Sequence, residues 1–171
     1  SEREPGVYYL FDEEHKKIDE LAVTRPHIDP TTMASMKAIR YKARDGLEIE
    51  AMLTLPVGRE PKKLPLIINP HGGPFGPRDE WRYNPEVQLL ANRGFAVIQP
   101  NYRGSGGYGD WFERLGYRQW GRAMQDDLTD AVKWAVDSGL ADPNRVVILG
   151  ASYGGYATMA GLTFTPELYA A

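Results

Sequence analysis

The sequence contains no cysteine, which excludes disulfide bonds, thiolate nucleophiles and cysteine metal sites. It has only three histidines, His15, His27 and His71, and these do not form an H-E-x-x-H pair. A histidine-based zinc site is therefore not expected either. We expect a protein that needs no metal and no cofactor.

Long apolar runs are also missing. The longest are short stretches such as VVIL at 146–149, far below the roughly 18 residues that a membrane span requires. The N-terminus lacks a basic start followed by an apolar stretch, so no signal peptide is expected. The net charge of −3 provides no basic surface for nucleic acid. We expect a soluble chain that binds neither membranes nor nucleic acid; the compartment stays open, with the cytoplasm favoured.

What is present is ordinary for a globular protein. Hydrophobic residues make up 42% and charged residues 25% of the 171 residues. This length allows one domain with a real core, or one domain together with a fragment of another.

The first part of the sequence predicts a hairpin and a linker. VYYLF at 7–11 and KKIDELAV at 16–23 are strand-like and flank the polar turn DEEH. One hairpin is too small to be stable alone. TRPHIDPTT at 24–32 carries two prolines and indicates a linker or crossing segment.

A second hairpin follows. KAIRYKAR at 37–44 and LEIEAMLTL at 47–55 alternate apolar and polar residues, and Asp45-Gly46 supplies the tight turn between them. One face should pack on a core and the other should face water. The residues of the core face are Ile39, Tyr41, Leu47, Ile49, Ala51 and Leu53.

After Leu64 the pattern changes to short apolar strands that do not alternate: LPLIIN, FAVIQ and RVVILG. Such strands are buried on both faces, as in a parallel sheet covered by helices. Helices are expected around 84–93 and 124–138, and Asp142-Pro143-Asn144 should be a turn leading into the last strand. The fold class is therefore α/β, a mostly parallel sheet flanked by helices, with an antiparallel hairpin at its start.

The stretch RVVILGASYGGYATMAG, residues 145–161, predicts a strand, a sharp turn and a helix, and the turn fits the nucleophile elbow G-x-S-x-G. In such a turn Ser152 is lifted above the end of the sheet. Side chains at Gly150 and Gly154 would collide with their neighbours, and the Tyr153 amide would point toward a forming oxyanion. The alternative is a serine in an ordinary helix-capping turn.

The second element is INPHGGPFGP at 68–77, directly after the first parallel strand. An H-G-G loop at this place supplies the second oxyanion donor in esterase-type hydrolases, and Gly72 and Gly73 allow the backbone to approach a carbonyl oxygen. His71 precedes the serine, whereas this architecture orders its triad serine, acid, histidine. We therefore expect His71 to hold the loop by a side-chain hydrogen bond and not to act as the base.

The third element is NYRGSGGYGDWF at 101–112. Three of its glycines match the dinucleotide-binding pattern G-x-G-x-x-G: Gly104, Gly106 and Gly109. That pattern requires the first glycine at the end of the strand, yet Pro100 to Arg103 intervene, and the acidic residues about 20 positions further on lie in a helix. A flexible loop bordering the active site fits better.

Other candidates have structural explanations. Asp126, Asp127 and Asp130 suggest a metal, but they fall in the first turns of a helix, where negative charge suits the helix dipole. The four tryptophans, Trp81, Trp111, Trp120 and Trp134, are expected to be packing residues, while Trp111 and Tyr108 are also candidates for lining a substrate cleft.

The stretches HGGP, NYRGSGGYG and GASYGGY, in this order and with a DDLTDAVKWAVDSG helix before the elbow, resemble the catalytic domain of the prolyl oligopeptidase family of serine peptidases. The resemblance covers about residues 36–171 and is nearest to the acylaminoacyl-peptidase and dipeptidyl-peptidase-like branch. It implies an α/β-hydrolase fold and no cofactor. Residues 1–32 more loosely resemble the end of the family's preceding β-propeller together with a linker.

The resemblance implies site residues: Ser152 as nucleophile, with the Tyr153 amide and the amide of Gly73 or Gly72 as oxyanion donors. In the prolyl-specific branch a tyrosine precedes the two glycines and donates its hydroxyl. Here His71 stands in its place, which favours backbone donation.

The family places its catalytic Asp and His downstream of the elbow, at positions that these residues do not include. We therefore expect residues 33–171 to be the N-terminal portion of the catalytic domain. The parent protein would hydrolyse short peptides through an acyl-enzyme, and this chain alone would be inactive. An open sheet edge beyond the elbow strand would favour self-association. The alternatives are a carboxylesterase and a non-catalytic binding module.

Overall fold

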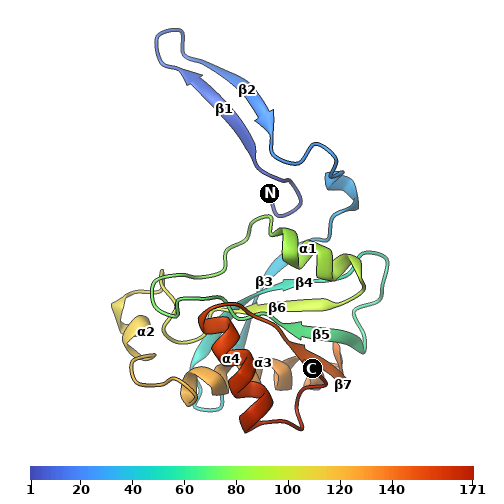
Figure 1. Cartoon of the computed structure of the whole chain (residues 1–171), viewed down its shortest axis with the longest axis vertical. Helices are drawn as coiled ribbons and strands as arrows, with labels where there is room; N and C mark the ends of the chain where they lie inside the picture. The colour runs from blue at the N-terminus through green and yellow to red at the C-terminus, as the bar shows by residue number, and fades with distance from the viewer.

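The computed structural model describes residues 1–171, and it divides into a projecting hairpin and a layered body (Figure 1). The hairpin is a two-stranded sheet, and the body is built on a five-stranded sheet. No helix has the length and hydropathy needed to cross a bilayer.

The hairpin consists of β1 (Val7–Asp12) and β2 (Lys17–Val23), paired antiparallel as predicted. It stands away from the body (Figure 1), and several large apolar side chains on it are more than half exposed. These are Tyr8, Tyr9, Leu10, Phe11, Ile18 and Leu21. The assignment of residues 1–32 to a preceding propeller-like domain stays a prediction.

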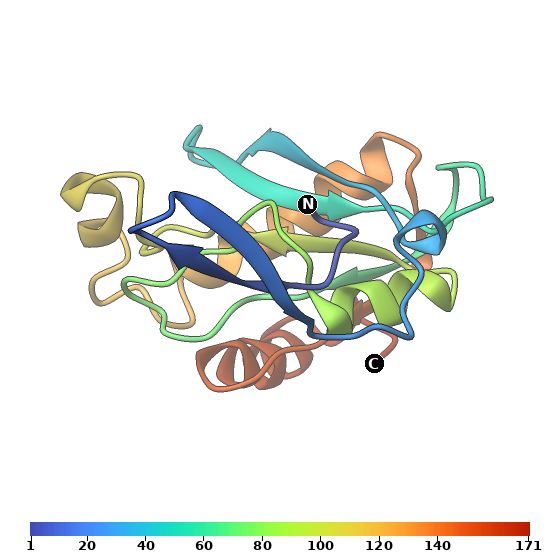
Figure 2. The same ribbon diagram turned by 90° about the horizontal axis from the view of Figure 1, so that it is seen from above.

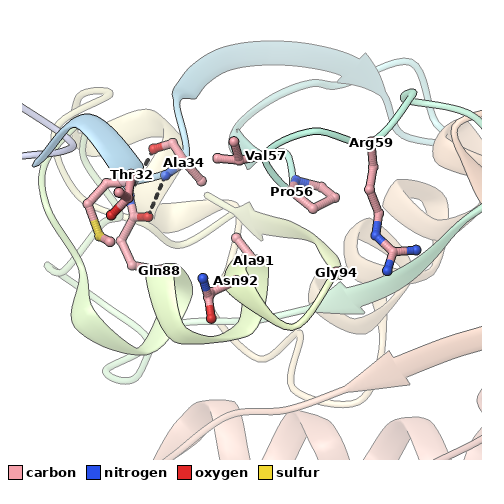
Figure 3. Close-up of a pocket in the computed structure, with 10 residues that line it drawn as sticks. Thr32, Ala34, Pro56, Val57, Arg59, Gln88, Ala91, Asn92 and Gly94 are labelled. Atoms are coloured by element: carbon pink, nitrogen blue, oxygen red, sulfur yellow. Dashed lines mark hydrogen bonds between the residues drawn. The ribbon is translucent and has the colours of Figure 1, made fainter. Parts of the chain in front are cut away.

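The linker is fastened to helix α1 (Pro85–Asn92) by one amide side chain. Gln88 Oε1 accepts from the Ala34 N–H at 2.8 Å, and Gln88 Nε2 donates to the Ala34 carbonyl oxygen at 2.9 Å (Figure 3). Gln88 Nε2 also donates to the Glu2 carbonyl oxygen at 3.0 Å. A small cavity of about 60 Å³ lies beside this contact, between the linker and α1. No candidate site residue lines it, so it is a packing gap at the linker.

The five strands of the main sheet lie in the order β3-β4-β6-β5-β7. β4 pairs antiparallel with both β3 and β6, whereas β5 pairs parallel with β6 and β7. This confirms the predicted α/β architecture with an antiparallel edge. The strand bounds are β3 (Met36–Lys42), β4 (Glu48–Thr54), β5 (Leu64–Ile68), β6 (Ala96–Pro100) and β7 (Ala141–Ile148).

Helices cover both faces of this sheet. α1 lies on one face, and α3 (Ala123–Asp137) and α4 (Tyr153–Phe164) lie on the other (Figures 1 and 2). Ile67 and Val97 pack against α1, while Ile68 belongs to the larger core under α3 and α4. The central strands are buried on both sides for this reason, which explains their apolar runs without alternation.

The second hairpin, β3 and β4, has the predicted core face, but its other face is only partly exposed to solvent. All six predicted core residues lie in or against the larger core. Met36, Met52 and Thr54 on the opposite face are also buried. The prediction that this face is exposed was wrong for Met52 and Thr54, and Met36 lies just before the predicted strand; α1 covers this end of the hairpin.

The predicted packing role fits Trp134, which lies against the core, and Trp120, whose ring contacts Tyr153 and Tyr156. Trp81, Trp111 and Trp120 are each about half exposed. The predicted position of the turn at 142–144 needs correction. Residues 142–144 form a turn in which Asp142 Oδ1 accepts from the Asn144 N–H at 2.9 Å, but this turn lies within β7, where the pairing with β5 changes register.

Strand β7 forms one edge of the sheet, and part of that edge is occupied by the end of the described chain. The Ala170 N–H donates to the Val146 carbonyl at 2.7 Å, and the Ile148 N–H donates to the Ala171 carbonyl at 3.1 Å. Self-association through this edge stays a prediction.

Candidate active site

Ser152 lies at the junction between β7 and α4, at the N-cap position of the helix. Its backbone has φ 58° and ψ −122°, a left-handed conformation that side chains other than glycine rarely adopt. A non-glycine residue held there costs of order 1–3 kcal/mol and is found where the surrounding structure imposes it. The sequence thus places its only elbow serine in a strained turn at the end of a strand.

Two glycines flank this serine because there is no space for a side chain. A Cβ on Gly150 would lie 2.7 Å from the carbonyl carbon of Gly154. A Cβ on Gly154 would collide with the carbonyl oxygen of Pro70. The elbow therefore packs backbone against backbone, both within itself and against the loop that follows β5.

That neighbouring loop runs directly beside the serine. A Cβ on Gly72 would lie 3.3 Å from Ser152 Cβ and 3.7 Å from Ser152 Oγ. Asn69 reinforces the contact, since its side-chain amide donates to the Leu149 carbonyl at 2.8 Å. Tyr153 is the first residue of α4, so its N–H has no acceptor in a preceding helical turn. The structure brings together the predicted nucleophile and the segments of both predicted oxyanion donors.

Ser152 is exposed, and its hydroxyl makes no hydrogen bond within the chain. His15 lies in the turn of the hairpin, where its ring bonds to Asp12, and His27 lies in the linker. His71 is nearer, but both of its ring nitrogens bond to other groups. None of the three histidines is hydrogen-bonded to Ser152.

His71 connects two loops. Its Nδ1 lies 2.7 Å from the Gly72 carbonyl oxygen, and its Nε2 lies 2.8 Å from Ser105 Oγ. The ring stacks on Tyr102 at 4.5 Å, and the Tyr102 hydroxyl donates to the His71 carbonyl at 2.8 Å. Burial lowers the pKa of His71, which favours its neutral form. This arrangement is the loop-holding role that the sequence suggested.

The glycine-rich segment that follows β6 is not a flexible loop, and that prediction was wrong. All residues from 101 to 106 are buried, and a short helix, α2 (Asp110–Arg114), follows. A Cβ on Gly106 would collide with the Gly76 carbonyl oxygen, and the Gly106 N–H donates to the Pro77 carbonyl at 3.1 Å. Glycine here allows close packing against the loop that holds Gly72.

An ion pair holds the same segment to α3. Arg103 donates to both carboxylate oxygens of Asp127, at 2.9 Å from Nε and 2.8 Å from Nη2. A second contact joins Arg103 to Asp45 in the β3–β4 turn at 2.8 Å. Burial raises the pKa of the Asp127 carboxyl, and the hydrogen bonds and charge of Arg103 offset part of that rise.

The other acidic residues of α3 also form ion pairs. Arg44 bonds to Asp126 at 2.8 Å and to Asp130 at 2.9 Å. Asp126 lies in the first turn of α3, as the helix-dipole prediction requires, and ion pairing to the β3–β4 turn is a further structural role for Asp126 and Asp130. No group of three or more His, Asp or Glu side chains is arranged to hold a metal ion.

Aromatic side chains surround the residue after the nucleophile. Tyr153 contacts Trp120 at 4.8 Å and Tyr102 at 5.3 Å between ring centroids, and Tyr156 lies 5.1 Å from Trp120. Trp120 and Tyr156 are partly exposed and provide an apolar surface next to the elbow. This surface was not predicted, because its residues come from separate segments.

Tyr108 and Trp111, the predicted cleft residues, line a different cavity of about 230 Å³. It lies against the hairpin of β3 and β4, with Glu48 and Glu50 in its wall, and neither Ser152 nor a predicted oxyanion donor lines it. Their place in a substrate cleft is not supported by this lining.

Comparison with known proteins identifies relatives of the whole chain. The profile described as the prolyl oligopeptidase family matches residues 81–171, just over half of the chain. A dipeptidyl aminopeptidase, named BIII, from Pseudoxanthomonas mexicana is 40% identical over 97% of the chain, which covers 25% of that relative.

Solved structures share the fold. A puromycin-hydrolyzing peptidase from Mycobacterium tuberculosis superposes with a TM-score of 0.84 at 29% identity, over 96% of this chain and 26% of that one. An acylaminoacyl peptidase from Pyrococcus horikoshii gives a TM-score of 0.76 at 28% identity, over 94% of this chain and 26% of that one. The chain thus spans about a quarter of the length of the relatives it matches.

Proposed function

The chain belongs to the prolyl oligopeptidase family of peptidases, and on that premise we propose that Ser152 is the nucleophile of a serine peptidase. The observation that carries the proposal is the contact between two separate motifs. The backbone of Gly72 lies against the side chain of Ser152, and Ser152 is held in a strained, exposed position at the start of α4. A helix-capping serine would not require this strain.

In the proposed reaction Ser152 Oγ attacks a peptide carbonyl. The negative charge on the carbonyl oxygen is then stabilised by the N–H of Tyr153 and the N–H of Gly73 or Gly72. The amine leaves, an acyl-enzyme remains on Ser152, and water releases the acid. The N-terminus of α4 adds a favourable dipole for the same charge.

We propose that the general base is none of the three histidines of residues 1–171, because none of them is hydrogen-bonded to Ser152 and both ring nitrogens of His71 bond to other groups. The serine hydroxyl is weakly nucleophilic without such a base. We therefore propose that the 171-residue chain by itself hydrolyses peptides weakly or not at all.

For the substrate, we propose short peptides cleaved near their N-terminus. The relatives are named as a dipeptidyl aminopeptidase and an acylaminoacyl peptidase, and both names describe the release of N-terminal units. The protein that carries this sequence should turn over a dipeptidyl anilide or an acylaminoacyl anilide more efficiently than a simple ester. A preference for the ester in kcat/KM would instead support a carboxylesterase.

A fluorophosphonate probe tests the nucleophile. In the protein that carries this sequence, mass spectrometry should place the label on Ser152, and Ser152→Ala should abolish both labelling and peptide hydrolysis. Ser138→Ala is the matched control, because the Ser138 hydroxyl only caps the end of α3 by donating to the Ala135 carbonyl. Label on another residue, or full activity in Ser152→Ala, would overturn the assignment. Stoichiometric labelling of the isolated 171-residue chain would contradict its proposed inactivity.

A further inference from the structure

Ser105, in the buried segment after β6, contacts His71 from the side opposite Gly72. Its side chain is completely buried, and Ser105 Oγ lies 2.8 Å from His71 Nε2. On the other side of the ring, His71 Nδ1 lies 2.7 Å from the Gly72 carbonyl oxygen. The imidazole therefore bridges the segment after β6 and the loop beside Ser152.

Three groups face the ring nitrogens: Ser105 Oγ lies beside Nε2, while the Gly72 carbonyl oxygen and the Tyr102 hydroxyl, 3.2 Å away, lie beside Nδ1. A neutral imidazole carries one N–H, and burial favours the neutral form of His71. The Gly72 carbonyl can only accept. The Tyr102 hydroxyl donates its hydrogen to the His71 carbonyl at 2.8 Å, so at Nδ1 it accepts as well, and both partners favour the hydrogen on Nδ1. The bare Nε2 then needs a donor, and the Ser105 hydroxyl is the group within reach.

The Ser105 hydroxyl has one hydrogen and two acceptors within reach. Its oxygen also lies 2.7 Å from the Tyr102 carbonyl, which competes for the same hydrogen. That carbonyl, however, already accepts from the Ser105 backbone N–H at 3.0 Å. The hydroxyl can therefore donate to His71 Nε2 without leaving the carbonyl unpaired.

We propose that Ser105 is a positioning residue for the oxyanion donor on the Gly72–Gly73 peptide. By donating to His71 Nε2 it selects the Nδ1–H tautomer, and Nδ1–H in turn fixes the Gly72 carbonyl. This inference rests on the proposed function, in which the Gly73 N–H is one of the oxyanion donors.

The link from carbonyl to N–H follows from peptide geometry. The only cis peptide in the chain precedes Pro74, so the Gly72–Gly73 peptide is trans and planar. Its C=O and N–H point in opposite directions, and fixing one fixes the other. A hydrogen bond to the carbonyl also polarises the peptide and strengthens its N–H as a donor. In the other tautomer a bare Nδ1 would face the Gly72 oxygen, and the repulsion would turn the peptide.

Kinetics of the protein that carries this sequence test the effect on catalysis. Ser105→Ala should lower kcat about tenfold, less than the loss of a whole oxyanion donor, and change KM by less than about twofold. Ser105→Thr retains the hydroxyl and should recover most of the loss. Ser138→Ala, a matched loss of a serine hydroxyl elsewhere, should leave both constants unchanged. A normal kcat in Ser105→Ala, or a change confined to KM, would overturn the proposal.

The tautomer can be measured without any activity. In the 171-residue chain labelled with nitrogen-15 histidine, the ring of His71 should show a protonated Nδ1 and a bare Nε2, with the signals assigned by their loss in His71→Gln. Ser105→Ala should convert this pattern to a mixture of tautomers. A protonated Nε2 in the parent chain, or an unchanged pattern in Ser105→Ala, would overturn the proposal. Failure of Ser152 to react with the fluorophosphonate probe would instead remove the proposed function and leave the tautomer result standing.

Discussion

Arg103 and Asp127 form a two-point ion pair in which the Arg103 side chain is 8% exposed and the Asp127 side chain is not exposed at all. Asp127 also accepts from the Arg103 backbone N–H at 2.9 Å. Three hydrogen bonds thus join the segment after β6 to α3, and this segment carries Ser105. The ion pair therefore holds against α3 the segment whose Ser105 contacts His71.

Replacing Asp127 by Asn should be strongly destabilising. The change removes the charge that balances a buried guanidinium, and breaking one partner of such a pair costs about 3–5 kcal/mol. Urea unfolding of the 171-residue chain near neutral pH measures this loss. Asp137→Asn is the matched control, because Asp137 pairs with Lys133 on the exposed face of the same helix. Loss of this exposed ion pair should leave the urea midpoint of unfolding nearly unchanged. Equal midpoints for the two variants would contradict the role given to the buried pair.

Adjacent glycines of the elbow should respond in opposite ways to a methyl group. Gly154→Ala places a Cβ on the Pro70 carbonyl oxygen, so the elbow and the loop after β5 must separate. We expect a large loss of stability and no labelling of Ser152 in the protein that carries this sequence. In Gly155→Ala the nearest atom to the new Cβ is the Gly150 carbonyl oxygen, at 3.4 Å, which is an ordinary contact. Alanine also favours the helix over glycine by up to about 1 kcal/mol, so we expect this variant to be as stable as the parent chain or more stable. Similar thermal midpoints for the two variants would show that the steric argument is wrong.

The backbone strain at Ser152 predicts that removing the nucleophile can stabilise the chain. Glycine populates positive φ without steric cost, so Ser152→Gly should raise the free energy of unfolding by about 1 kcal/mol. Ser152→Ala keeps the strained backbone and should leave stability nearly unchanged, since the hydroxyl has no internal partner. Calorimetry of both variants gives the comparison. A Ser152→Gly variant no more stable than Ser152→Ala would mean that the turn is not strained.

The sequence predicted the parts of this molecule that depend on local pattern. Short apolar strands, the elbow glycines and the two hairpins each have a signal within a few residues, and the structure contains all of these elements. The sequence also allowed the inference that the H-G-G loop and the elbow lie side by side, because loops at the carboxyl ends of parallel strands meet at one edge of a sheet.

The rest depends on contacts between distant segments. Arg103 and Asp127 are 24 positions apart, and His71 and Ser105 are 34 apart, so no local pattern pairs them. The glycine-rich stretch 101–112 suggested a flexible loop, but Gly106 serves to bring two backbones together. Burial of Met36 and Met52 likewise required knowing that α1 crosses their face of the hairpin.

Asp79 provides the remaining prediction, which concerns pH. Burial raises the pKa of its carboxyl to about 7, against the opposing charge of Arg82. Asp79 Oδ1 accepts from Gln99 Nε2 at 2.8 Å, while Asp79 Oδ2 and Gln99 Oε1 are buried without a partner. A proton on Asp79 would let these two unpaired oxygens share a hydrogen bond.

The sign of the effect follows from proton binding. An unfolded aspartate ionises near pH 4, whereas folded Asp79 holds its proton up to about pH 7, so folding becomes less favourable as pH rises between these values. Asp79→Asn supplies a neutral N–H donor to Gln99 Oε1 at every pH. Its stability relative to the parent chain should therefore increase by about 2 kcal/mol from about pH 5 to about pH 8, measured by urea unfolding. Asp137→Asn, an exposed control, should show no such trend. A constant difference between Asp79→Asn and the parent across this range would mean that Asp79 is ionised in the folded chain throughout.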